Sequence, residues 1–92
     1  MLSQLRYPVE IAKEVGARVK VKRKKRKLTQ VELSERAGLS LASLKRFEQT
    51  GEISFVSLIK IAMVLDELEE FDELFTRKEY QSIQEVIDER NQ

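Results

Sequence analysis

The chain has 92 residues, of which 41% are hydrophobic and 36% charged, so it can form one small domain. One Pro and three Gly leave few helix breakers, which predicts an all-helical fold. The absence of Cys and His excludes disulfides, thiolate metal sites and an imidazole general base. We therefore expect no metal, no cofactor and no enzymatic activity. No apolar run approaches the ~20 residues of a membrane span and no signal-peptide pattern begins the chain, which predicts a cytoplasmic protein that does not bind membranes.

The net charge of +1 conceals a strong asymmetry between the two halves of the chain. Residues 1–50 contain 13 Lys or Arg and 5 Asp or Glu, a balance of +8, whereas residues 51–92 contain 4 and 11, a balance of −7. The cations are densest between residues 18 and 27. A cationic run alone is most simply a solvated surface, but this asymmetry also predicts a surface for a polyanion in the first half of the chain.

The first predicted helix begins at Pro8 and ends near Lys27. Its apolar stripe has helical spacing and consists of Ile11, Ala12, Val15 and Val19. Gly16 lies inside this helix and predicts either a kink or a close contact with another helix.

Two shorter helices are predicted next, each with a capping residue at its start and a glycine at its end. Thr29 caps the second helix, with Glu32 as its capping-box partner, and Gly38 ends it. Ser40 caps the third helix, which Gly51 ends. The residues expected to be buried in these two helices are Val31, Leu33, Ala37, Leu44 and Phe47.

Two further helices are expected to complete the core. Ser54 caps the fourth, whose apolar stripe runs over residues 55–65. The fifth covers residues 68–75 and carries an acidic, solvated surface beside a second apolar stripe that we also expect in the core. For the tail from Tyr80 to Ile87, a sixth amphipathic helix, a strand and a frayed end all remain open.

The second and third helices, joined by a short turn that contains Gly38, have the form of a helix-turn-helix. Small Ser34 allows close helix packing, and the apolar residues Leu33, Leu39, Leu44 and Phe47 set the angle between the helices. This pattern resembles the phage-repressor (Cro-like, XRE) helix-turn-helix family over residues 17–75. Two positions depart from the family's usual residues: Ser34 replaces Ala, and Lys27 replaces a common Gly.

The resemblance implies a five-helix lambda-repressor-like domain in residues 1–75, with the helix-turn-helix at about 29–50 and an extension in residues 76–92. It also implies that the third helix enters the major groove of double-stranded DNA. The implied base-contacting residues are Leu41, Ala42, Ser43, Lys45, Arg46 and Gln49. The implied phosphate contacts are Gln30, Lys20, Arg23, Lys24, Lys27 and Ser40. The family often pairs an arginine of the first helix with a glutamate of the third, which predicts that Glu48 orients Arg23 toward a phosphate.

The apolar residues near the C-terminus exceed what a small five-helix core needs, and we expect them to form a homodimer or partner surface. They are Leu74, Phe75, Tyr80, Ile83 and Ile87. The alternative is that the tail folds back over the core of its own chain. A homodimer would read a palindromic operator as a repressor, with autoregulation of its own operon as the expected role.

The chain also resembles the Hip-type antitoxin branch of the family, through its length, its Tyr7-Pro8 start and the Phe47-Glu48 end of the third helix. That branch partners Hip-type serine/threonine kinase toxins, and the acidic second half of this chain would suit a protein partner. Two alternatives stay open: a stand-alone phage-type regulator without a toxin, and a protein-interaction module that no longer binds DNA.

Overall fold

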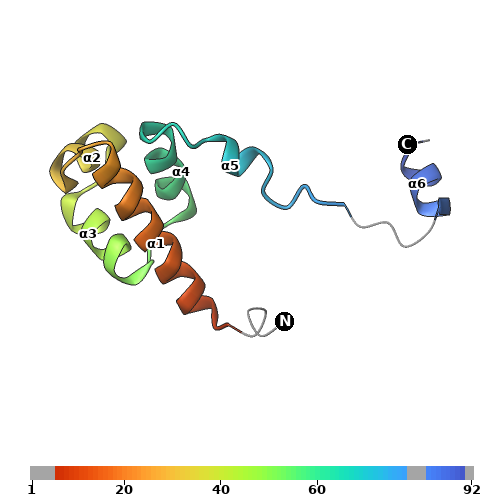
Figure 1. The fold of residues 1–92 in the computed structure, drawn as a ribbon, viewed down its shortest axis with the longest axis horizontal. Coiled ribbons are helices and arrows are strands. Elements are labelled where there is room, and N and C mark those ends of the chain that lie inside the picture. Colours follow the sequence, from red (N-terminus) through yellow and green to blue (C-terminus); the bar gives the residue numbers. More distant parts are fainter. Residues whose placement is uncertain (1–5, 79–82, 91–92) are drawn as a thin grey trace.

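The computed structural model describes residues 6–78 and 83–90, and within these ranges the chain forms helices and no strand. Helices α1 to α4 pack together, and a single helical turn, α5, follows them (Figure 1). The all-helical prediction is thereby confirmed. The bounds are α1 (Pro8–Lys25), α2 (Gln30–Ala37), α3 (Leu41–Thr50), α4 (Phe55–Val64), α5 (Glu69–Asp72) and α6 (Ile83–Arg90).

The predicted helix boundaries arise from local hydrogen bonds. The Thr29 hydroxyl accepts a hydrogen bond from the Glu32 N–H at 3.0 Å, and the Glu32 carboxylate accepts one from the Thr29 N–H at 2.9 Å. This second bond stabilises the ionised form and lowers the pKa of Glu32 below its usual value. Gly38 and Gly51 follow α2 and α3 with φ of 71° and 81°, the left-handed conformation that favours glycine.

The core lies where α2, α3 and α4 meet beneath α1, and its largest fully buried side chains come from α2, α3, α4 and the residue that follows α4. They are Phe47, Leu33, Leu44, Ile61 and Leu65. The expectation that Val31 is buried is wrong, because Val31 is 47% exposed. The inner face of α2 consists of Leu33, Ser34 and Ala37, and the helical repeat turns Val31 away from that face.

The second apolar stripe is largely outside the core, contrary to prediction. Helix α5 is one turn instead of the predicted span of residues 68–75, and Leu74 and Phe75 after it are exposed. Acidic residues continue to the end of this turn, where the helix dipole disfavours them. Phe75 has a φ of 61°, which is incompatible with continuing a right-handed helix.

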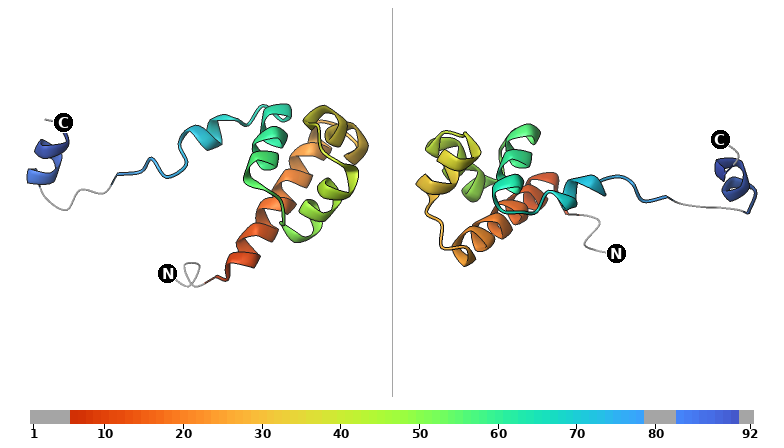
Figure 2. Two further views of the ribbon diagram at one scale, coloured as in Figure 1. Left: turned by 180° about the vertical axis from the view of Figure 1, so that it is seen from behind. Right: turned by 90° about the horizontal axis from the view of Figure 1, so that it is seen from above.

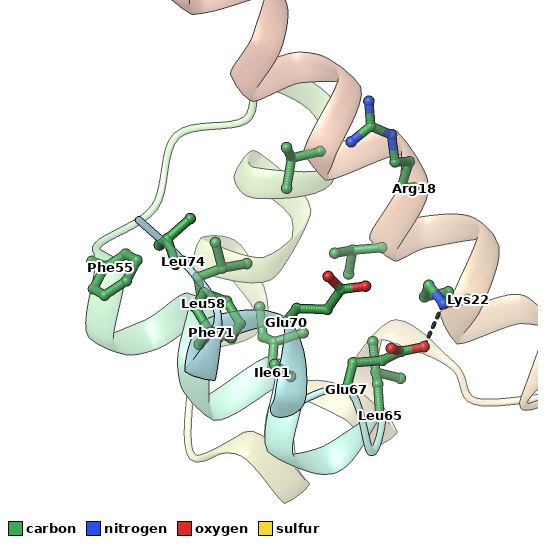
Figure 3. A pocket seen from close by; sticks show the side chains of 13 residues that line it. Arg18, Lys22, Phe55, Leu58, Ile61, Leu65, Glu67, Glu70, Phe71 and Leu74 are labelled. Carbon is green, nitrogen blue, oxygen red and sulfur yellow. Dashed lines mark hydrogen bonds and ion pairs between the residues drawn. The ribbon is translucent and has the colours of Figure 1, made fainter. Parts of the chain in front are cut away.

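A shallow apolar groove of about 430 Å³ runs between α1, α4 and α5 (Figure 3). Phe55 and Phe71 line it and contact each other edge to face, with ring centroids 5.6 Å apart. Phe55 is 55% exposed, although its position in the apolar stripe predicted burial, because it begins α4 at the mouth of this groove. At the other end of the groove, Lys22 forms an ion pair with Glu67 and donates a hydrogen bond to its carboxylate. This hydrogen bond lowers the pKa of Glu67 below its usual value.

The C-terminal tail, for which a helix, a strand and a frayed end were open, forms a helix, α6, over Ile83–Arg90. Helix α6 lies away from the bundle when the molecule is seen from the front, from behind and from above (Figures 1 and 2). Helix α6 therefore does not fold back over the core. Ile87 is 43% exposed, while Tyr80 and the side chain of Ile83 lie outside the described residues.

Helices α1 and α3 cross with their backbones in close contact. A Cβ atom added to Gly16 would lie 2.4 Å from the carbonyl oxygen of Phe47, and one added to Gly51 would lie 2.3 Å from the carbonyl carbon of Ala12. Both distances are too short for non-bonded atoms. Of the two roles open for Gly16, the structure shows the close helix contact.

We predict that Gly16→Ala destabilises the protein, although alanine is intrinsically the better helix former by about 1 kcal/mol. The added methyl would push α1 away from the backbone of α3, which cannot rotate out of the way. Thermal unfolding followed by circular dichroism measures the effect. Gly38→Ala is the control, since no atom lies within 4 Å of its added Cβ and only the left-handed φ penalises it, by about 1–2 kcal/mol. A Gly16→Ala melting temperature at or above the wild-type value would contradict the close contact.

Candidate nucleic-acid interface

Helix α3 has one buried face and one face open to solvent. Leu44, Phe47 and Glu48 are its buried residues. Because a helix repeats every 3.6 residues, the side chains between them point outward. Five of the six residues predicted to contact bases are exposed, and only Leu41 is half-buried. The exposed five are Ala42, Ser43, Lys45, Arg46 and Gln49.

The start of α3 is held by Ser40, which was predicted to contact phosphate as well as to cap the helix. Its hydroxyl accepts a hydrogen bond from the Ser43 N–H at 3.1 Å and donates one to the Ser43 hydroxyl at 2.8 Å. Ser40 is exposed, so it stays accessible to a ligand. Its first role is to fix the end of the helix from which Leu41 and Ala42 project.

A buried ionic network ties α3 to α1. Arg23 donates from Nε to Glu48 Oε2 at 2.7 Å and from Nη2 to Glu48 Oε1 at 3.0 Å, a two-point contact. Arg23 Nη1 also donates to the Leu28 carbonyl at 2.8 Å. Arg23 and Glu48 are therefore in contact, as expected. However, Arg23 is only 6% exposed, which leaves it little surface for the phosphate contact that was predicted.

Gln30 joins this network in a way that sequence reasoning missed. Its side-chain amide donates to Glu48 Oε1 at 3.0 Å, which orients Gln30 at the N-terminal end of α2. A cleft of about 280 Å³ opens beside it, lined by Lys20, Gln30, Lys45, Glu48 and Gln49. The cleft brings together two lysines from α1 and α3 and a helix N-terminus, a combination suited to a phosphate group. Lys45 was predicted to contact a base, but it lies among these phosphate candidates.

Arg46 lies in a second cleft, of about 310 Å³, formed by α3, the loop after it and the start of α4. Its guanidinium forms an ion pair with Glu52, and both side chains are more than half exposed. Sequence reasoning missed Glu52, because a residue six positions beyond Arg46 and past the end of α3 has no helical relation to it. The arginine predicted to read a base therefore has a carboxylate partner in the free protein.

The remaining predicted phosphate contacts follow α1 toward its C-terminal end. Lys24 comes one helical turn after Lys20 and is exposed on the same side of α1. Lys27 lies past the end of α1 and has a φ of 57°. This conformation favours glycine, which accounts physically for the glycine that the resemblance leads us to expect there. The lysine therefore adds backbone strain as well as charge.

Comparison with known families supports this interpretation of the surface. A family model described as helix-turn-helix matches residues 19–71, which is more than half of the chain. The chain belongs to this helix-turn-helix family. The match supports the resemblance to phage-repressor (Cro-like, XRE) proteins. It indicates that the chain is a sequence-specific DNA-binding regulator. No curated protein matches the chain. None of the helices in the described ranges is long and apolar enough to cross a membrane.

We predict that Glu48→Ala costs about 3–5 kcal/mol of folding free energy, because it leaves the Arg23 guanidinium buried without its counter-ion. Urea denaturation of the variant and the wild type measures the difference. Glu35→Ala, which removes an exposed carboxylate from α2, is the control and should change stability by less than about 0.5 kcal/mol. Equal losses in the two variants would mean that the buried network does not hold α1 and α3 together.

Proposed function

We propose that this helix-turn-helix protein is a homodimeric transcriptional repressor that binds a palindromic operator, autoregulates its own operon in the cytoplasm and has no enzymatic activity. The main support for this proposal is the outward face of α3, which is open to solvent and flanked by two clefts lined by different kinds of residue. One cleft holds Lys20, Gln30 and Lys45, and the other holds Arg46.

The two clefts suggest two kinds of contact with DNA: one that positions the protein on the duplex and one that reads the base sequence. Lysines and a helix N-terminus bind phosphate regardless of sequence, so the cleft at Gln30 fixes the register of the protein on the duplex. The guanidinium of Arg46 can make two hydrogen bonds to guanine O6 and N7 in the major groove. Ala42 and Leu41 lack donors and would contact thymine methyl groups.

A gel-shift salt titration on the DNA upstream of the protein's own gene tests DNA binding. Each phosphate contact should lower log K by about 0.9 per log unit of salt, so Lys20→Ala should reduce this slope by about 0.9 and weaken binding to all sequences alike. Arg46→Ala should cost about 1–3 kcal/mol on the preferred site and relax specificity at one base pair. The absence of any salt-sensitive shift would favour the alternative of a protein-interaction module that no longer binds DNA.

Dimerisation is supported by exposed apolar side chains beyond the helix-turn-helix, at Leu74, Phe75 and Ile87. A dimer would place two copies of α3 about 34 Å apart, one turn of DNA.

Phe75 is 96% exposed, so Phe75→Ser removes almost no packing within its own chain. We predict that this variant shifts the protein toward monomer in sedimentation equilibrium with an unchanged helix content in circular dichroism, and that its melting temperature falls only by the stabilisation that dimerisation contributes. Val21→Ser, at a half-exposed apolar residue of α1, is the control. An unchanged dimer in the Phe75 variant would exclude this surface.

A second candidate function is that of antitoxin to a kinase toxin of the Hip type. It is favoured by the exposed combination of acidic residues on α5 with the apolar side chains after it, which would suit a protein better than DNA. An adjacent reading frame that encodes a kinase-like protein, and co-purification of its product with this chain, would support that role. Without such a neighbour, the stand-alone regulator is favoured.

A further inference from the structure

We propose that Glu52 is a specificity-determining residue, which positions the guanidinium of Arg46 for a base edge and keeps it from binding phosphates. This inference rests on the proposed DNA-binding function and assigns a role to a residue outside α3, the recognition helix that would enter the major groove. It starts from the ion pair between Glu52 and Arg46 in the cleft beside α3.

The loop after α3 is built to bring Glu52 back to Arg46. The Gly51 N–H donates to the Phe47 carbonyl at 2.7 Å, and the φ of 81° at Gly51 reverses the chain. The Glu52 N–H then donates to the Thr50 hydroxyl at 3.1 Å, and that hydroxyl donates to the carbonyl of Arg46 at 2.7 Å. The backbone of Glu52 is thus connected by hydrogen bonds to the residue with which its side chain pairs.

The close contact between α1 and α3 holds this loop in place. Gly51 packs directly on the backbone of Ala12 and Lys13, with no space even for a Cβ atom. The loop therefore has little freedom to carry Glu52 away from the recognition helix. Positioning of Arg46 by Glu52 consequently depends on the helix crossing and not only on a contact between two long side chains.

The geometry of the pair leaves Arg46 able to bind a base. The contact runs from Nη2 of Arg46 to Oε2 of Glu52. A guanidinium has five N–H donors in a planar fork, and Nη2 carries two of them, so its second N–H and the neighbouring N–H of Nε or Nη1 stay available for the O6 and N7 acceptors of guanine. A carboxylate that holds one end of the fork restricts the rotamers of a flexible side chain and so reduces the entropy lost on docking.

The charge of Glu52 has a second effect, on contacts with the DNA backbone. An unpaired arginine beside the major groove can bind any nearby phosphate and stabilise complexes with every sequence. The Glu52 carboxylate neutralises Arg46 and repels phosphate, which makes such contacts unfavourable. A guanine edge carries no net charge and escapes most of this repulsion. Glu52 therefore raises the ratio of specific to non-specific affinity.

The pair has little importance for folding, which makes the role testable. Both side chains are more than half exposed, and exposed ion pairs contribute little to stability. Glu52→Gln removes the charge while it keeps the size of the side chain, and the melting temperature should stay at the wild-type value. Glu35→Gln is the matched control, since it removes one carboxylate from the exposed surface of α2, where the structure shows no contact with Arg46.

The experiment measures the affinity of the protein for a duplex selected from a random pool, for the set of its single-base-pair variants and for a scrambled duplex. Glu52→Gln should lower discrimination at the base pair read by Arg46 about fivefold or more. It should also tighten binding to the scrambled duplex and steepen its salt slope by about 0.9, because Arg46 gains a phosphate contact. Glu35→Gln should leave discrimination unchanged.

A double-mutant cycle shows whether Glu52 acts through Arg46. In the Arg46→Ala background, Glu52→Gln should no longer change discrimination. An equal effect in both backgrounds would mean that Glu52 contacts a base itself, for example the N4 amino group of cytosine, and would overturn the positioning role. Full discrimination by Glu52→Gln in the presence of Arg46 would also overturn it, with the proposed function intact. A wild-type protein without sequence preference would instead refute the proposed function, and this inference with it.

Discussion

The close crossing of α1 and α3 is the constraint on which the rest of this structure depends. At one end Gly51 packs on the backbone of Ala12, in the middle Gly16 packs on Phe47, and at the other end Arg23 and Glu48 form their buried pair. The first two contacts allow the helix backbones to approach, and the third makes the approach specific, because a buried charge without its partner is strongly unfavourable. The C-terminal half of α3 is thus fixed against α1, the longest helix of the described residues.

This crossing also determines which faces of α1 carry charge toward the polar cleft and which line the apolar groove. Helix α1 presents Lys20 and Lys24 on the side of the polar cleft at Gln30, while Val15, Arg18 and Lys22 line the apolar groove with α4 and α5. These two sets lie on different faces of one helix, as their spacing requires. A near-neutral chain can therefore direct positive charge toward a nucleic acid, while ten of its 16 acidic residues follow α4 in the sequence. The net charge of +1 shows none of this, since it sums over surfaces that face different partners.

Most of the fold could be predicted from the sequence because its helix ends are locally determined. Thr29, Ser40 and Ser54 each accept the capping hydrogen bond that was expected of them, and these bonds depend only on residues three positions away. Burial depends on the tertiary arrangement, so Val31 and Phe55 have the right residue type for a core but lie outside it. The contact between Arg23 and Glu48 was predicted through the family resemblance, since 25 residues separate them in the chain.

The ion pair between Arg46 and Glu52 could not be predicted from the sequence. Nothing in the spacing of the two residues brings them together, because their contact arises from a left-handed turn at Gly51 and two hydrogen bonds at Thr50. Motifs describe the elements that carry function, whereas selectivity also depends on the loops that these elements hold in place.

Some unfavourable features of the free protein lie near the C-terminal end of α1, on the side that would face DNA. Lys27 holds a left-handed backbone conformation that costs a lysine about 1–2 kcal/mol, and it follows three exposed cations, Lys24, Lys25 and Arg26. Neighbouring like charges repel one another, and only part of this repulsion is offset by the helix dipole at the C-terminus of α1. Local departures from favourable structure persist where function requires them. A polyanion beside this end of α1 would relieve the repulsion, so the same residues that weaken the isolated fold would strengthen the complex.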